Sequence, residues 1–337
     1  MDFNNNKLAV ERLTALWALN ECGLGGFMHA LSSPFTGIIV GGISILLLSL
    51  IALYSENTWS AIFKALCVVL LVKLGVSPHT PIGAYVAVSF QALFAALVYS
   101  LFHVKLLTTV LLGGITFLES AIQKLIVLTI VYGQSLWEAI NVYGAYVSEK
   151  MEFLPLALSS KTLSLLFISF YFSVGVLAGF LISKTIALIK DNSTTEDIYI
   201  PKHSNLDIGI TKKCVFSKKA PIFWAVTLLL VCIPLVFFNT KYGGLEKGMY
   251  LVARSVSILL IWYLLLAPLS LRWLRKLLSN RSGQYKLEVQ NTLDLLPYLQ
   301  DIVLHAWGQS KSLKGFERIQ NFMVKSIVYS IYFNRPK

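Results

Sequence analysis

The chain has 337 residues, of which 56% are hydrophobic and only 14% are charged. Its mean hydropathy of +0.68 is well above that of soluble domains. This composition excludes an ordinary soluble enzyme and predicts an all-α polytopic membrane protein. Lys and Arg outnumber Asp and Glu by 29 to 17. In so apolar a chain this excess indicates basic cytoplasmic loops, and we expect no nucleic-acid partner.

Apolar runs near the length of about 20 residues that a bilayer requires predict eight spans. Six lie before residue 190, namely Leu8–Leu19, Phe35–Leu53, Ala61–Val76, Ile82–Phe102, Leu106–Tyr132 and Leu163–Ile189. The first of them is short and extends toward Cys22. Two follow, Ile222–Phe238 and Leu251–Leu269. We therefore expect a six-span bundle at 1–190, a cytoplasmic basic linker at 191–220 and a two-span module with cytoplasmic helices at 221–337.

The distribution of positive charge predicts how the chain lies in the membrane. Lysines crowd the linker, and Lys and Arg are frequent from Arg272 to Lys337. Both regions are therefore expected in the cytoplasm, which places both termini inside and makes the chain a multi-pass protein of the inner (plasma) membrane. The Gln134–Ser160 loop and the Asn20–Gly37 segment then face outward. Glu11 and Arg12 interrupt the first apolar run, so we expect no cleaved signal peptide.

Polar side chains at membrane depth point to a functional site, because such groups are costly and usually face a bundle interior or a cavity. Several of them fall in the outer half of the predicted bundle, and Glu119 and Gln123 share one helix face. We expect an outward-facing substrate pocket, closed by a mobile lid loop at Asn20–Gly37 whose glycines let the backbone approach a ligand. The candidate substrate-binding residues are Asn20, Glu21, His29, His79, Gln91, Glu119 and Gln123.

Structural roles remain open for the same residues. Glu119 can pair with Lys124 or with a neighbouring helix. The two histidines can be interfacial polar residues, and Gln91 can simply bridge two helices. The cysteines at 22, 67, 214 and 232 lack metal-ligand spacing, so we expect reduced structural residues and no metal site.

The region after Leu269 predicts amphipathic helices. A basic stretch that contains Arg272, Arg275, Lys276 and Arg281 is typical of a helix that lies on the inner membrane surface and attracts anionic lipids. Two apolar stripes follow, Leu295, Leu299, Ile302, Val303 and Ala306, then Phe316, Ile319, Phe322, Met323 and Ile327. These helices either coat the membrane surface or dock a soluble partner.

Residues 1–190 resemble the substrate-binding (S) component of energy-coupling factor (ECF) transporters. The resemblance lies in six spans, an N-terminus inside and a long external loop after the first span, "LTALWALNECGLGGFMHALSSPFTGIIVGG". It implies an outer pocket that the external loops cap. By this resemblance Glu21, His29 and His79 fall in the capping loops, and Gln91, Glu119 and Gln123 fall in spans that line the pocket.

The chain from Ile222 onward resembles the coupling (T) component of the same transporters. Arg254 lies in an apolar span, and "LPYLQDIVLHAWGQSKSLKG" runs from Leu296 to Gly315. In that family a coupling helix ends in Ala-Arg-Gly and engages the ATPase; here Ala306, Trp307 and Gly308 occupy those positions, with Lys311 and Lys314 nearby. The resemblance implies an importer of a small micronutrient whose ATP is bound by separate cytoplasmic ATPase subunits.

Two rival classes of function remain at this stage. The chain carries no nucleophile elbow, no His-Glu-x-x-His and no phosphate-binding glycine loop, so we expect neither enzymatic activity nor a cofactor in the chain itself. An intramembrane lipid-modifying enzyme would instead use Glu119 or a histidine as a general base. A membrane scaffold would recruit a soluble partner through the basic tail. The sequence does not name the substrate.

Overall fold

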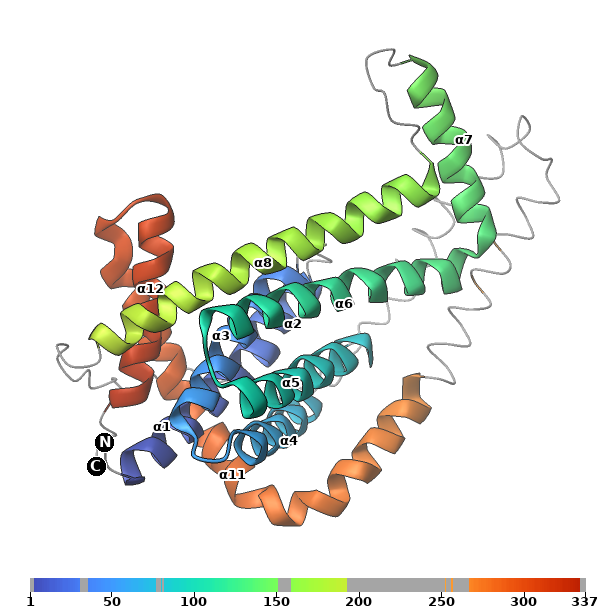
Figure 1. Cartoon of the computed structure of the whole chain (residues 1–337). Helices are drawn as coiled ribbons and strands as arrows, with labels where there is room; N and C mark the ends of the chain where they lie inside the picture. The colour runs from blue at the N-terminus through green and yellow to red at the C-terminus, as the bar shows by residue number, and fades with distance from the viewer. Residues whose placement is uncertain are drawn as a thin grey trace. The chain divides into compact units, whose positions relative to one another are not determined.

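The computed structural model describes residues 3–30, 36–76, 80, 82–150, 159–192, 252, 256 and 267–333. The elements found in them are all helical, and none of these residues forms a strand. They are α1 (Phe3–Leu19), a π-helix at Asn20–Leu24, α2 (Gly25–Ala30), α3 (Thr36–Tyr54), α4 (Thr58–Val76), α5 (Ile82–Phe102), α6 (Leu106–Tyr132), α7 (Gln134–Lys150), α8 (Ser160–Asn192), α11 (Ala267–Gln309), a 3-10 turn at Ser310–Ser312 and α12 (Gly315–Tyr332) (Figure 1).

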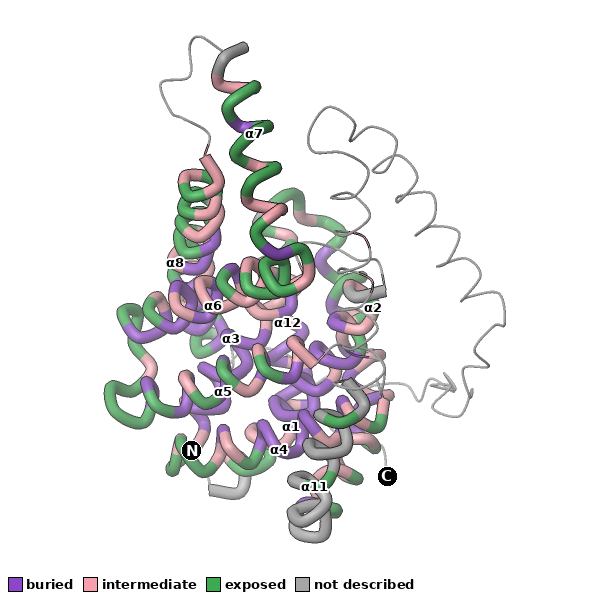
Figure 2. The backbone as a smooth tube through the Cα atoms, turned by 90° about the vertical axis from the view of Figure 1, so that its right-hand side faces the viewer, coloured by how far each residue is buried: buried purple, intermediate pink, exposed green. Residues whose placement is uncertain are grey.

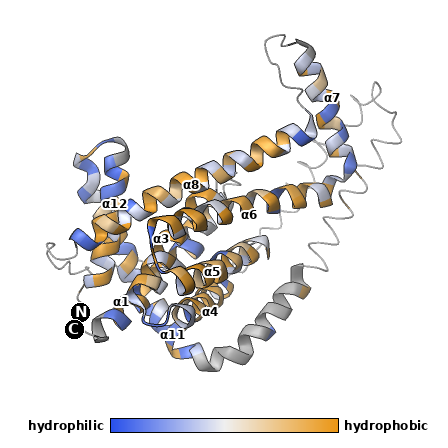
Figure 3. Cartoon of the chain, viewed as in Figure 1, coloured by the Kyte–Doolittle hydropathy of each residue, from blue (hydrophilic) through white to orange (hydrophobic). Residues whose placement is uncertain are grey.

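Five of these helices, α3 to α6 and α8, are long and apolar enough to cross a membrane. These helices are mostly hydrophobic along their length (Figure 3). These five helices and the absence of strands from the described residues fit the expected all-α membrane protein. Helix α1 is not among the five, because it has only 17 residues and carries Lys7, Glu11 and Arg12. The predicted spans Ile222–Phe238 and Leu251–Leu269 fall almost entirely outside the described residues.

The chain divides into two compact units. Unit 1 comprises 1–121, 168–206 and 272–337, and unit 2 comprises 122–167 and 207–271. The C-terminal segment therefore belongs to the same unit as the N-terminal helices, whereas the sequence suggested a division after residue 190. The functional division into a binding module and a coupling module stays a prediction.

Helix α1 lies at the centre of unit 1. It packs against α3 and α4, and α4 packs against α5. Leu13, Ala15, Trp17 and Ala18 are fully or almost fully buried, and purple tube segments mark this core (Figure 2). Residues 44–52 of α3 are buried on every side of the helix, as its uniformly apolar sequence requires. Helix α1, which is not a candidate membrane span, is thus shielded from lipid by the helices around it.

Glycines set the distance between α6 and α8 within unit 1. A Cβ atom added at Gly179 would lie 2.6 Å from the Cα atom of Val110 and 2.7 Å from the carbonyl oxygen of Thr109. The two backbones therefore touch, as at other small-residue contacts between membrane helices. On the opposite side α8 exposes large apolar residues such as Phe170 and Leu177, which suits contact with lipid.

The C-terminal helices pack onto the N-terminal bundle. The guanidinium group of Arg12 donates a hydrogen bond of 2.5 Å to the carbonyl oxygen of Ile331 and lies 4.1 Å from the ring centroid of Phe333. The ammonium group of Lys64 on α4 lies 2.7 Å from a carboxylate oxygen of Glu288 on α11. Residues after 271 thus contribute to the packing of α1 and α4.

One of the two predicted apolar stripes in this segment is correct in outline. On α11, Leu295, Leu299, Ile302 and Ala306 are buried, and Val303 is half-buried. On α12 the predicted stripe is correct only in part, because Ile327 is buried and Phe322 and Met323 are half-buried, whereas Ile319 is 55% exposed. The buried face of α12 consists of Val324, Ile327, Val328 and Ile331, which pack on the α1 side of the helix.

The segment Gln134–Ser160, expected as an external loop, is helical over most of its length, because α7 occupies Gln134–Lys150; its position outside the membrane stays a prediction. Gly133 ends α6 with a φ of 69°, a backbone conformation that glycine adopts without strain, and its N–H still bonds to the carbonyl of Thr129. The side chain of Asn141 accepts a hydrogen bond of 2.6 Å from the N–H of Ser160 at the start of α8. A sharp turn and a second helix therefore replace the loop.

Replacement of Gly179 by alanine should destabilise unit 1. The added methyl group would overlap the backbone of α6, and overpacking of this kind costs about 1–3 kcal/mol. We expect a lower Tm for Gly179→Ala in thermal unfolding of the detergent-solubilised protein. Gly75→Ala is the matched control, because no atom lies within 4 Å of that Cβ position; it should unfold at the wild-type temperature or slightly above. Equal Tm values for both variants would contradict the close contact.

Candidate functional site

The segment that follows α1 is helical rather than a loop. The chain continues through the π-helix at Asn20–Leu24 into α2 without leaving helical geometry, and the N–H of Gly25 bonds to the carbonyl of Asn20. The expectation of a lid loop is therefore wrong for residues 20–30. Asn20, Glu21 and Cys22 are buried in this wider turn, although two of them are strongly polar. π-Helical turns inside longer helices occur often at functional sites.

Glu21 forms an ion pair with Lys73 in the interior of unit 1. The carboxylate oxygen Oε2 lies 2.6 Å from the ammonium nitrogen Nζ, and the two side chains are 3% and 2% exposed. Lys73 comes from the last turn of α4, and its Nζ lies 5.8 Å from the ring centroid of Tyr85 on α5. Away from water the mutual attraction of two charges is strong, and so is the cost of leaving either one unpaired.

The hydroxyl group of Ser44 on α3 connects this ion pair to α1. It donates a hydrogen bond of 2.7 Å to Oε1 of Glu21. It accepts hydrogen bonds from Nδ2 of Asn20 at 2.9 Å and from the indole N–H of Trp17 at 3.2 Å. A serine hydroxyl has one donor and two acceptor positions, so its capacity is used completely. Trp17, Asn20, Glu21, Ser44 and Lys73 are called the polar cluster below.

Asn20 has one polar atom that no described residue satisfies. Its Nδ2 donates to the carbonyl oxygen of Val40 at 3.1 Å as well as to Ser44, whereas its Oδ1 is buried and accepts no hydrogen bond. The Val40 carbonyl fixes the orientation of the amide, because a flipped amide would place two acceptors against each other. A buried acceptor without a donor costs about 1–3 kcal/mol. Oδ1 is therefore a position at which a ligand donor would be stabilised.

Three other residues predicted for the substrate pocket have described side chains, and none of the three belongs to the polar cluster. Gln91 is buried, and its Nε2 donates a hydrogen bond of 2.8 Å to the carbonyl of Gly41, so it bridges α5 and α3. Glu119 on α6 is half-buried and forms no ion pair with a described residue; Gln123 lies one turn further along the same helix. His29 belongs to α2, but its side chain is not described, and His79 lies outside the described residues.

Sequence reasoning identified Asn20 and Glu21 but missed their partners. Lys73 stands in the apolar run Ala61–Val76, and the rule that a charge at membrane depth needs a partner would have singled it out. Ser44 and Trp17 carry no comparable signal, because serine and tryptophan are ordinary residues in membrane helices. Only the packing of α1 on α3 shows that they belong to the polar cluster.

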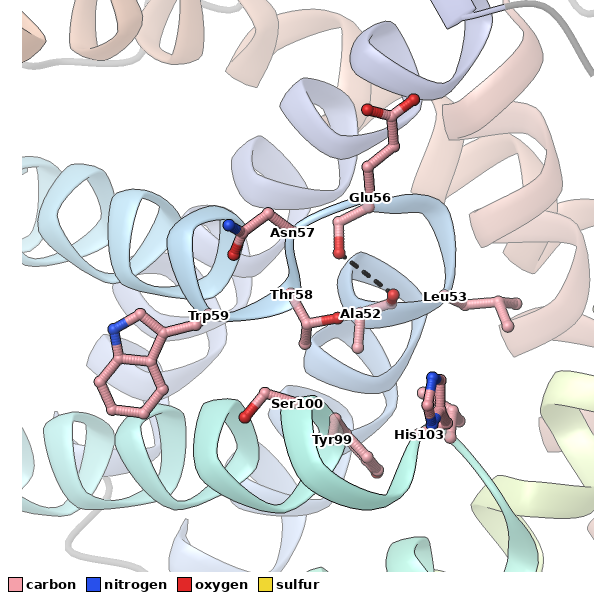
Figure 4. A pocket seen from close by; sticks show the side chains of 11 residues that line it. Ala52, Leu53, Glu56, Asn57, Thr58, Trp59, Tyr99, Ser100 and His103 are labelled. Atoms are coloured by element: carbon pink, nitrogen blue, oxygen red, sulfur yellow. Dashed lines mark hydrogen bonds between the residues drawn. The ribbon is translucent and has the colours of Figure 1, made fainter.

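A second concave region lies at the opposite end of α3 and α5. It is a cavity of about 430 Å³ between the α3–α4 turn and the α5–α6 turn. Figure 4 shows Trp59 and His103 at its two sides, with the hydroxyl of Ser55 donating to the carbonyl of Ala52. His103 has a φ of 60°, which is strained for a residue other than glycine, and its carbonyl accepts a hydrogen bond from Thr108.

The residues predicted for coupling lie near the turn between α11 and α12. Ala306 is fully buried, whereas Trp307, Gly308, Lys311 and Lys314 are exposed. The guanidinium group of Arg318 lies 4.3 Å from the Trp307 ring, and Phe322 meets that ring edge-on at 5.1 Å. Trp307 is therefore held in place while 43% of it stays exposed. Arg254 lies outside the described residues.

No family model, curated protein or solved structure matches the chain. The resemblance to ECF transporter components therefore depends on the sequence alone. Within the described part of the chain, no three His, Cys, Asp or Glu side chains gather where they could hold a metal ion.

A double-mutant cycle tests the energetics of the ion pair. Lys73→Met leaves the Glu21 carboxylate buried without its partner and should lower the free energy of unfolding by about 3–5 kcal/mol. The double variant Glu21→Gln with Lys73→Met leaves no uncompensated charge and should be clearly more stable than Lys73→Met. Denaturant unfolding in detergent micelles measures the wild type, these two variants and the single variant Glu21→Gln, which completes the cycle. Additive losses in the double variant would show that the two side chains do not interact.

The ion pair at the other end of unit 1 predicts an effect of pH. The ammonium of Lys64 donates to Glu288 and, together with the charge of Lys7, lowers the pKa of that carboxyl below its ordinary value of 4.5. The resulting stabilisation is present above pH 4.5 and is lost as the pH falls through the lowered pKa. Glu288→Gln should therefore lower the Tm at pH 7, and the difference in Tm from the wild type should shrink as the pH falls through the lowered pKa. Glu56→Gln, at an exposed turn, is the control and should leave the Tm unchanged at each pH.

Proposed function

We propose that the chain is the membrane component of an ECF-type importer in the inner (plasma) membrane, with both termini in the cytoplasm. It binds a small micronutrient at the polar cluster and acts together with separate cytoplasmic subunits that bind ATP. The observation that carries the proposal is the Glu21–Lys73 ion pair, buried among helices of a membrane protein. Ionisable residues in such positions most often mark the path or site of a substrate.

The position of the polar cluster supports access from outside. Glu21 follows the end of α1, Lys73 lies in the last turn of α4, and Ser44 lies in the first half of α3. With the N-terminus in the cytoplasm, these parts of the three helices lie in the outer half of the membrane. Helix α2, which packs on the π-helix and on α3, exposes 60% of Phe27. A short helix with so little buried surface is a suitable cover for a site that opens and closes.

The C-terminal segment supports coupling to a soluble partner. Trp307, Lys311 and Lys314 form an exposed aromatic and basic surface, and exposed Trp residues often anchor protein interfaces. Helix α12 follows this surface and is bonded to α1 through Arg12 and Ile331. The same helix α1 leads to Glu21. A displacement of α12 by an ATPase subunit would therefore act on the element that carries the binding residues.

Purification of the tagged protein from its own cells in mild detergent tests the coupling. We expect an ATPase subunit to co-purify, and its recovery to fall at least tenfold in the double variant Lys311→Glu with Lys314→Glu, because the basic surface is reversed in charge. Lys161→Glu, an exposed lysine at the start of α8, is the control and should keep the subunit. Recovery of the chain alone would overturn the coupling, and a product formed from labelled lipid would favour the intramembrane enzyme.

A further inference from the structure

We infer that the polar cluster selects a solute that is electrically neutral or zwitterionic and carries an N–H donor beside an oxygen acceptor. The inference depends on the proposed function, because it takes the polar cluster to be the solute site. Three observations support it: the charge balance of the polar cluster, the unsatisfied oxygen of Asn20 and the complete use of Ser44.

The charge balance limits the net charge of the solute. Glu21 and Lys73 contribute one negative and one positive charge, and both are almost completely buried. A solute with a net charge would leave one charge uncompensated at this depth, and even partly compensated buried charges cost several kcal/mol. A solute with no net charge leaves the balance unchanged. This argument favours neutral amides, lactams and ureas, and zwitterions such as amino acids, over carboxylates and amines.

The hydrogen-bond pattern determines which groups the solute must present. When the solute separates the ion pair, its N–H donor replaces Lys73 at Oε2 of Glu21, and its oxygen replaces Glu21 at the ammonium of Lys73. Ser44 continues to hold Oε1 of Glu21, because its single donor is already directed there. A second donor of the solute would satisfy Oδ1 of Asn20, which is buried and accepts no hydrogen bond from a described residue. Each charge therefore has a partner both before and after binding.

The experiment uses the full chain in detergent and a polar-metabolite extract of bacterial cells as the probe. After incubation and rapid gel filtration, mass spectrometry identifies the solutes retained with the protein and sorts them by net charge at pH 7. We expect a net-neutral or zwitterionic solute to be enriched. Its retention should fall at least tenfold in Glu21→Gln with Lys73→Met, a double variant that leaves no buried charge unpaired, and also in Asn20→Ala. Ser49→Ala removes a hydroxyl from the same helix that bonds to Tyr99 outside the polar cluster, and it should retain the solute.

The other outcomes separate the inference from the proposed function. Enrichment of an anion or a cation that the double variant loses would overturn the solute class but keep the polar cluster as the site. Enrichment that the double variant keeps would overturn both the solute class and the site. If no solute is enriched, the inference fails, whereas the importer itself is decided by the co-purification of an ATPase subunit.

Discussion

The buried ion pair between Glu21 and Lys73 restricts how α1, α3 and α4 of unit 1 can pack against one another. Neither charge can be left without its partner at membrane depth, so the end of α1 and the last turn of α4 must stay within hydrogen-bond distance. Ser44 extends the same requirement to α3. Three helices that could otherwise slide along one another are thus fixed by one set of polar contacts. In an apolar bundle, where van der Waals packing alone permits many arrangements, such contacts favour a single one.

Helix α1 meets a comparable demand near its middle. Arg12 is buried, donates a hydrogen bond to the Ile331 carbonyl and lies over the Phe333 ring. A helix with one buried charge near its middle and another just after its end is a poor membrane span by itself, and it is stable only when other helices surround it. This explains why α1 lies in the core, and why residues after 271 belong to the same compact unit as the N-terminal helices.

The parts of the fold that depend on local sequence were predictable. Length and apolarity alone identify α3 to α6 and α8, and the rule on polar groups at membrane depth identifies Asn20 and Glu21. The errors have a common physical cause. Glycines, together with polar residues, suggested a loop after α1, but the burial and pairing of Asn20 and Glu21 stabilise a helical conformation that propensity does not favour. The partner Lys73 is 52 residues away from Glu21, and only tertiary packing brings them together.

Under the proposed function, the same packing would keep the solute site closed until a solute arrives. A pocket that held only Glu21 would carry an unpaired charge until a solute arrived, and the empty state would be strongly destabilised. With Lys73 as an internal partner, the polar cluster is electrically balanced by itself. Under the proposed function, the cost of opening the site would lie in separating these two charges, and the solute would have to supply a partner for each. The pair would then act as a filter, because a solute with only a donor or only an acceptor leaves one of the two charges unpaired.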